Sequence, residues 1–290
     1  MSDEISLGVI GGSGLYQIES LSSVKTHEID TPFGKPSSPI VTGQLAGKQI
    51  AFLARHGLGH VLSPSEVNYR ANIFALKSLG VRRILSISAC GSLREELKPG
   101  HIVVPDQLFD FTRGTRKRSF FEDGIVAHIG TADPFCEELS NEVYQALHEV
   151  GAIVHKGGTF IAIEGPRFST RAESNVFRSL GMSIIGMTAA PEAFLAREAE
   201  ISYAVMAHVT DYDVWHVNEE PVTVEMVVST LNQNTQTAQK AVEVLLAHLP
   251  DVFDCPCQHA LETAIITHPE KFNPLTKSRL NLLLGKYFKQ

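Results

Sequence analysis

The sequence predicts an α/β protein in which a β-sheet presents a binding site at the ends of its strands. At least five short apolar runs of strand length end in polar residues or glycine. Amphipathic segments of helical length alternate with these runs. The chain has 290 residues, of which 43% are apolar and 20% charged, so it is long enough to bury a substantial core.

The expected strands are the short apolar runs that meet a turn. They lie at residues 7–10, 49–54, 84–92, 102–105, 160–163 and 184–188, with a last one from Ala204 to the carboxylates Asp211 and Asp213. Helices are expected over 68–79, 134–150 and 223–249, after Thr170 and from Pro191. Thr170 and Glu173 have the spacing of a capping box. We expect one catalytic domain over 1–250 and a C-terminal extension of two short helices over 251–290.

Charge and hydropathy exclude several classes of function. The net charge of −7 argues against general nucleic-acid or anionic-membrane binding. The basic cluster from Arg113 to Arg118 is expected to be a solvated loop. No apolar run reaches transmembrane length, and the acidic residues after Met1 differ from a signal peptide, so we expect a cytoplasmic protein.

The four cysteines are too few for a disulfide scaffold. Cys90 and Cys136 are expected to be isolated buried thiols. Cys255 and Cys257 form a close pair, but no second pair completes a zinc site, so no metal is expected. A redox-sensitive or local disulfide role for this pair stays open.

Several expected strand ends carry hydrogen-bond donors. These donors are Ser13, Arg55, His56, Ser88, the Ala89 amide and Thr188. Neither G-x-G-x-x-G nor G-x-x-x-x-G-K-[ST] occurs, so dinucleotide and P-loop sites lose their main support. Many donors with one obligate positive charge suit inorganic phosphate better than a polyphosphate. Taken singly, the glycines are explained equally well by a tight turn, and Arg55 with His56 by a surface pair.

Asp211 and Asp213 end a buried run, and an extended chain would project both to the same side. Two buried acids on one side are costly unless they face a ligand. A strand end followed by an Asx-type turn is the alternative reading.

Longer motifs support a specific resemblance. They are Gly11-Gly12-Ser13-Gly14-Leu15, Asp30-Thr31-Pro32-Phe33-Gly34-Lys35-Pro36, Leu53-Ala54-Arg55-His56-Gly57, Val67-Asn68-Tyr69-Arg70-Ala71-Asn72, Ala89-Cys90-Gly91-Ser92-Leu93-Arg94-Glu95-Glu96, Glu164-Gly165-Pro166-Arg167-Phe168-Ser169 and Thr210-Asp211-Tyr212-Asp213. In this order, over about residues 6 to 250, the chain resembles the purine nucleoside phosphorylase family, and most closely its 5′-methylthioadenosine phosphorylase branch.

The resemblance implies a mixed central β-sheet or barrel flanked by helices. It implies phosphorolysis of S-methyl-5′-thioadenosine to adenine and 5-methylthioribose 1-phosphate, in purine and methionine salvage, with no metal or organic cofactor. The implied phosphate ligands are Ser13, Arg55, His56, Ser88, Ala89 and Thr188. Met187 would lie against the ribose and Phe168 near the base. Asp211 would act as the catalytic acid, and Asp213 would address the purine.

Other positions bear on specificity. Branches of the family that act on 6-oxopurines carry Glu where Ser169 stands and Asn where Asp211 stands, so both positions favour adenine. Val222 and Val224 fit an apolar methylthio pocket, although they also fit the packed start of a helix. His128 is similar to a histidine that the family contributes across a trimer interface, which implies a homotrimer or a dimer of trimers.

Three alternatives remain open. A broader adenosine or methylthioinosine phosphorylase is one, because Gly186 stands where many adenine-type relatives carry asparagine. A non-catalytic nucleoside-binding protein is another, although it would have no use for the phosphate donors. A ribosyl hydrolase is disfavoured for the same reason.

Overall fold

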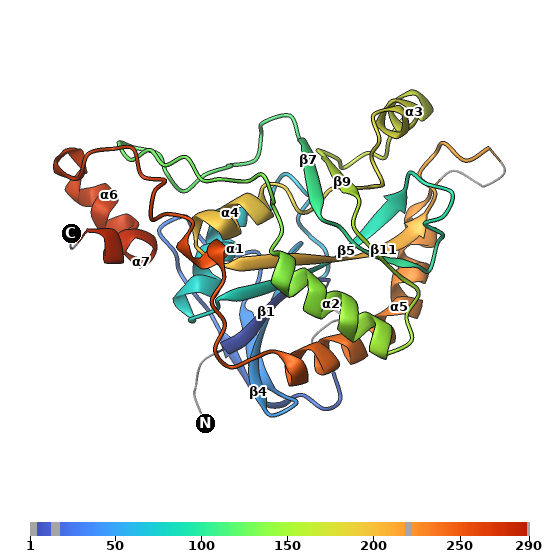
Figure 1. Ribbon diagram of the computed structural model, residues 1–290, viewed down its shortest axis with the longest axis horizontal. Coiled ribbons are helices and arrows are strands. Elements are labelled where there is room, and N and C mark those ends of the chain that lie inside the picture. The colour runs from blue at the N-terminus through green and yellow to red at the C-terminus, as the bar shows by residue number, and fades with distance from the viewer. Residues whose placement is uncertain (1–4, 13–17, 218–221, 289–290) are drawn as a thin grey trace.

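A computed structural model describes residues 5–12, 18–217 and 222–288 (Figure 1). The strands are β1 (Ile5–Gly11), β2 (Ser22–His27), β3 (Ile40–Leu45), β4 (Lys48–Ala54), β5 (Arg83–Ser92), β6 (Ile102–Val104), β7 (Gln107–Phe111), β8 (Val154–Lys156), β9 (Thr159–Ile163), β10 (Ile184–Gly186) and β11 (Ser202–Asp211). The helices are α1 (Tyr69–Ser78), α2 (Glu137–Glu149), α3 (Arg171–Ser179), α4 (Glu192–Glu198), α5 (Val224–His248), α6 (Pro274–Arg279) and α7 (Asn281–Leu284).

The strands form one mixed sheet that branches at β5. Its main path runs β2-β3-β4-β1-β5-β10-β9-β7, while β11 pairs with β5 and leads through β6 to β8. The pairs β1–β4, β1–β5 and β5–β11 are parallel, whereas β10 and β5 are antiparallel. The expected mixed α/β fold is therefore confirmed, and β5 holds its centre.

Two hydrophobic cores lie on opposite faces of β11. Val205, Ala207 and Val209 belong to one, with residues of α1 and α4, and the alternate residues Ala204 and Met206 belong to the other, with α2 and α5. All ten residues of β11 are buried. This burial explains why the strand reads as a continuous apolar run rather than an alternating one.

Most expected elements are present, with ends shifted by a few residues. The capping box is confirmed. The Thr170 side chain accepts the backbone N–H of Glu173, and the Glu173 side chain accepts the backbone N–H of Thr170. Strands β2, β3, β7 and β8 were not predicted. The five leading residues of β2 are exposed, so this edge strand lacks the apolar signal on which the prediction depended.

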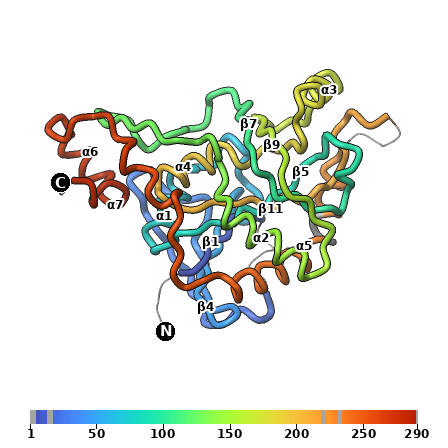
Figure 2. Tube along the Cα trace, viewed as in Figure 1, coloured from blue at the N-terminus to red at the C-terminus, as the bar shows by residue number. Residues whose placement is uncertain are grey.

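Residues 251–288 pack against the sheet domain instead of standing apart from it. Leu261, Phe272 and Leu284 join the α1–α4 core, and Ile266 N donates to Val126 O, which ties the extension to the 125–128 segment. Figures 1 and 2 show α6 and α7 at the end of the molecule opposite α3. Besides the two expected short helices, the extension holds three 3₁₀ turns.

The expectation that Cys136 is isolated was wrong. Its sulfur lies with those of Cys255 and Cys257, all within 4.8 Å of one another. Sequence reasoning missed the cluster because 119 residues separate Cys136 from Cys255. In the described residues, no helix is long and apolar enough to cross a membrane.

Candidate active site

An opening in the sheet lies beside β5. Strand β1 pairs with β5 only as far as Ser86, and β10 joins the same edge only at Gly91 and Ser92. Among the described strands, none pairs with residues 87–90 on that edge. Because unpaired backbone groups need partners, this stretch is suited to receive a ligand or side chains. The ends of β4, β9, β10 and β11 surround it.

Arg55, at the end of β4, is almost completely buried and forms an ion pair with Glu192 at the start of α4. Arg55 Nε donates to Glu192 Oε2 at 2.8 Å, and Nη2 donates to Oε1 at 2.9 Å. Tyr203 Oη donates to the same Oε1 at 2.7 Å. Burial alone would lower the pKa of Arg55, but the Glu192 charge outweighs it and the pKa is raised. The guanidinium is therefore permanently charged and held rigidly.

Three of the expected phosphate residues meet through hydroxyls. Arg55 Nη2 donates to Ser86 Oγ at 2.7 Å, Ser86 Oγ lies 3.4 Å from Ser88 Oγ, and Thr188 Oγ1 donates to Ser88 Oγ at 2.9 Å. Sequence reasoning missed Ser86, which links them. Ala89 belongs to the unpaired edge of β5, and Ser13 lies outside the described residues.

His56 is half-buried, and its hydrogen bonding differs from the expected donor role. Its Nδ1 lies 2.9 Å from Leu62 O, and because a carbonyl only accepts, Nδ1 carries the proton. Burial, followed by the Arg55 charge, lowers the pKa of His56 to about 4. The neutral ring then presents Nε2 as an acceptor, which suits a phosphate hydroxyl.

Asp211 and Asp213 are both buried, but not as two positions of one extended strand. β11 ends at Asp211, Asp213 has φ +51°, and Asp213 N donates to Asp211 Oδ1 at 2.7 Å. The expectation of an extended chain was wrong at Asp213, and the Asx-type turn is present. Both side chains nevertheless border Gly91, where an added Cβ would lie 2.9 Å from Asp211 Oδ1 and 3.3 Å from Asp213 Cβ.

Burial shifts both acids toward the neutral form. It raises the pKa of Asp211 to about 6, although hydrogen bonds from Thr210 and the Asp213 amide oppose the shift. Burial also raises the pKa of Asp213, against the nearby hydroxyls of Ser174 and Ser169. Asp213 Oδ2 has no hydrogen-bonding partner among the described residues. An unpartnered buried acceptor beside a protonatable acid is the arrangement that a heterocycle with a donor group can satisfy.

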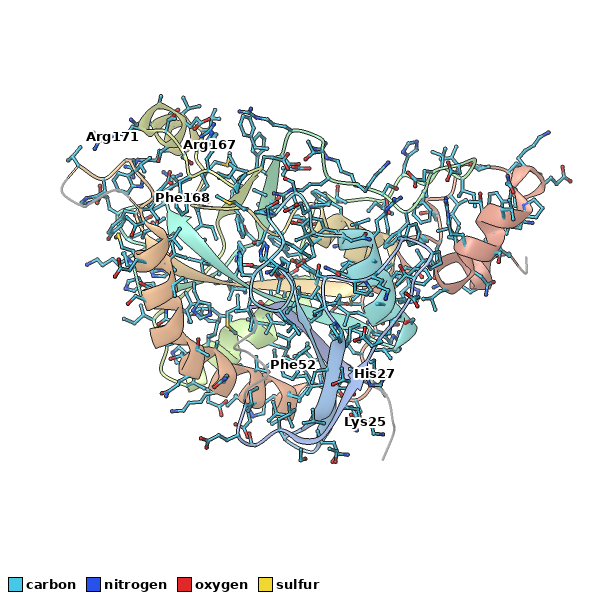
Figure 3. All side chains as sticks on the ribbon, turned by 180° about the vertical axis from the view of Figure 1, so that it is seen from behind. Lys25, His27, Phe52, Arg167, Phe168 and Arg171 are labelled. Carbon is cyan, nitrogen blue, oxygen red and sulfur yellow. The ribbon has the colours of Figure 1, made fainter. Side chains whose placement is uncertain are left out.

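The loop after β9 contributes further residues. Gly165, at φ +69°, approaches the Met187 side chain so closely that a Cβ would lie 2.5 Å from its sulfur. A cavity of about 120 Å³ is lined by Gly165, Ser169 and neighbouring residues. Ser169 is buried, whereas Phe168 is 36% exposed on the loop before α3, at the rim of the molecule (Figure 3).

Arg116 corrects the expectation that the basic run is a solvated loop. Its guanidinium is buried and donates to the Met187 and Ala190 carbonyls at 2.9 and 2.6 Å, and to those of Ile163 and Glu164 at 3.2 and 2.8 Å. It also reaches the Glu164 carboxylate and Tyr69 Oη. Arg116 thus joins the ends of β9 and β10, which carry the site residues.

Comparison with known proteins identifies the family. Residues 6–247 match the phosphorylase superfamily. This chain belongs to the phosphorylase superfamily. Two relatives, both S-methyl-5′-thioadenosine phosphorylases, are similar over nearly their full length. That of Geobacter sulfurreducens is 53% identical over 97% of this chain and 98% of its own, and that of Chloroflexus aurantiacus is 51% identical over 97% and 98%.

Solved structures of phosphorylases share the fold. A methylthioadenosine phosphorylase from an antarctic soil metagenomic library has a TM-score of 0.92 and 46% identity, over 98% of this chain and 100% of its own. The enzyme from Schistosoma mansoni, in complex with adenine, has a TM-score of 0.84 and 38% identity, over 89% of this chain and 96% of its own.

The remaining residues expected to set specificity differ in their exposure. Val222 is buried, whereas Val224, the first residue of α5, is 67% exposed and does not pack in the core. His128 is exposed, and its backbone N–H donates to Ala264 O of the C-terminal extension. Gly186 lies against Phe160, whose ring would be 2.8 Å from an added Cβ, which accounts for glycine at this strand end.

Proposed function

We propose that this phosphorylase cleaves S-methyl-5′-thioadenosine with inorganic phosphate to give adenine and 5-methylthioribose 1-phosphate. The observation that carries the proposal is the buried pair Asp211 and Asp213. Burial raises the pKa of Asp211 to about 6, and Asp213 Oδ2 has no hydrogen-bonding partner among the described residues. The relatives with about 50% identity act on this nucleoside by their names, and the pair supplies a physical reason for the same choice of base.

Breaking the ribosyl C–N bond develops positive charge on the sugar and negative charge on the departing purine. Protonated Asp211 would share its proton with N7 of the base and stabilise the leaving group. Phosphate below the ring would stabilise the cationic sugar and then bond to C1′. Each contact of this kind contributes on the order of a few kcal/mol.

The phosphate would lie along the unpaired edge of β5. Ser88, Thr188, the Ala89 amide and Arg55 Nη1, which also donates to Ile87 O, would hold it, together with His56 and Ser13. Because Arg55 is already paired with Glu192, its net charge in the site is small. That favours a single phosphate, whose binding needs many oriented donors more than bulk positive charge. The reaction requires no metal and no organic cofactor.

Asp213 would select the base. An ionised or hydrogen-bond-accepting Oδ2 accepts from a 6-amino group, whereas a 6-oxo group would leave two acceptors facing each other. Ser169, buried beside Asp213, places a hydroxyl where a glutamate would add a carboxylate facing the base. Met187 would lie against the ribose, and Phe168, exposed in this structure, would cover the base.

The 5′ end of the substrate would contact a separate set of residues. Val222 and Val224 would form the methylthio pocket, and His128, which is exposed, would serve a neighbouring subunit of a homotrimer or a dimer of trimers. The exposed position of Val224 agrees with a pocket completed by another chain. We expect the enzyme to act in cytoplasmic purine and methionine salvage.

The test measures base release from methylthioadenosine, adenosine and methylthioinosine, each with and without phosphate. We expect phosphate-dependent adenine release, fastest from methylthioadenosine. Release without phosphate would identify a hydrolase, and binding without turnover would identify a nucleoside-binding protein. Release from methylthioinosine alone would overturn the role of Asp213 and favour the alternative suggested by Gly186.

A matched pair of variants tests the base selection. Asp213→Asn combined with Ser169→Glu should shift the ratio of kcat/KM for adenosine and inosine substrates toward inosine by at least tenfold. Asp213→Asn alone should move the ratio in the same direction but less. An unchanged ratio in the double variant would remove both residues from base selection.

A further inference from the structure

Three buried cysteine side chains form a cluster that the proposed reaction does not use. Cys136 begins α2, while Cys255 and Cys257 flank Pro256 in the C-terminal extension. Their sulfurs lie within 4.8 Å of one another, and those of Cys136 and Cys255 are 3.7 Å apart. All three are free thiols in this structure. In its thiolate form, cysteine is a nucleophile and a metal ligand.

We propose that Cys136, Cys255 and Cys257 bind one thiophilic d¹⁰ cation, Zn²⁺ or Cu⁺, as thiolates. Sulfur ligands at about 2.3 Å from a tetrahedral ion lie about 3.8 Å apart, which agrees with the spacing of Cys136 and Cys255. Sulfur-only ligands favour soft ions over Mg²⁺ or Ca²⁺. A three-thiolate set suits trigonal Cu⁺, or Zn²⁺ with one further ligand.

The surroundings supply the contacts that thiolates need. Cys136 is the N-cap of α2, a helix of 13 residues, whose N-terminal amides favour a negative sulfur. Ser202 Oγ lies 3.0 Å from Cys255 Sγ and can donate to it. The Arg197 guanidinium places a positive charge near Cys257. The described residues thus provide a helix end, a hydroxyl and a cation around the sulfurs.

Such a cation would join three parts of the chain. It would link the start of α2 and the C-terminal extension, and through Ser202 the first residue of β11. Asp211 lies at the far end of that strand, about 30 Å away by the rise of an extended chain. The site would therefore stabilise the fold and would not take part in the reaction. A metal at this site would differ from the expectation from sequence that no metal is bound.

The test measures metal content of the full chain, purified under reducing conditions, by elemental mass spectrometry. We expect about one Zn or Cu per chain, or uptake of about one equivalent of added Zn²⁺ or Cu⁺. Added Co²⁺ should give near-ultraviolet thiolate-to-metal absorption. Cys136→Ser, Cys255→Ser and Cys257→Ser should each lower the metal content at least tenfold.

Cys90→Ser is the matched control, because Cys90 is a buried thiol outside the cluster, and it should keep the metal. Measurement on the unmodified chain keeps the proposal testable if a variant does not fold. A reduced chain that takes up none of the three ions would overturn the proposal. A second result would also overturn it: a metal-free chain whose intact mass is lower by two hydrogens and which still binds no ion after reduction. That result would assign the cluster to a disulfide.

Discussion

Replacing Arg116 by methionine should destabilise the protein more than any other change in its basic run. The substitution keeps the apolar stem but removes the donors to four backbone carbonyls, at Ile163, Glu164, Met187 and Ala190. If water reaches part of the site, each carbonyl costs about 1 kcal/mol, so we expect a loss of about 4 kcal/mol. The Glu164 carboxylate would lose the Arg116 partner as well.

Urea unfolding of Arg116→Met and Arg118→Met measures this difference. Arg118 is the matched control, since its side chain is 46% exposed, donates to Thr112 and forms an ion pair with Asp110 at 3.7 Å. It should cost less than about 1 kcal/mol. We also expect KM for nucleoside to rise in Arg116→Met, because the ends of β9 and β10 lose their common anchor. Equal urea midpoints for the two variants would refute the role of Arg116 as an anchor.

Four further predictions concern the acids and their neighbours. With phosphate saturating, kcat/KM should fall as pH rises above the Asp211 pKa of about 6, because Asp211 then loses its proton. Asp211→Asn should lower turnover about 100-fold and remove that pH dependence. Near-normal rates in this variant would exclude Asp211 as the acid. Gly91→Ala should displace the Asp211 carboxylate and lower kcat at least tenfold with little effect on the urea midpoint; an unchanged kcat would contradict the contact. Glu192→Gln should lower the free energy of unfolding in urea by about 3 to 5 kcal/mol, because Arg55 stays buried without its counter-charge. Added phosphate should stabilise this variant more than the unmodified chain. Equal stabilisation of both proteins would argue against Arg55 as a phosphate ligand. Burial raises the pKa of Glu198 from 4.5 to about 7. Its contribution to the free energy of unfolding is therefore complete below pH 4.5, and about 3 kcal/mol of that free energy is lost as pH rises through 7. Glu198→Gln should reduce this loss, and parallel curves of stability against pH for the variant and the unmodified chain would contradict the role of Glu198.

The sequence was sufficient for features that have a local signature. The buried run of β11, the capping box at Thr170 and the stop of α5 before Pro250 each depend on residues close in the chain. Arg55, Ser88 and Thr188 were also identified from the sequence, because each lies in or next to an apolar run of strand length, although β10 runs antiparallel to β5 and Ser88 lies within β5. Sequence reasoning thus located these site residues but not the side chains that form hydrogen bonds and ion pairs with them.

What the sequence did not reveal depends on distant partners. Glu192 reads as an ordinary acid in the first turn of a helix, yet its partner Arg55 lies 137 residues earlier. Arg116 stands among exposed basic residues that have the same composition but no buried acceptors. The turn at Asp213 stood only as an alternative to an extended chain, because a left-handed residue after a strand leaves no mark on hydrophobic periodicity.

Different strand ends carry two tasks within one enzyme. Groups proposed to hold phosphate lie on β5 or just after β4 and β10, whereas those proposed to choose the base follow β9 and β11. A substitution at Ser169 or Asp213 can therefore change which nucleoside is accepted without disturbing the strands that hold the common co-substrate. In such an architecture, a lineage can exchange one purine for another while its reaction stays the same.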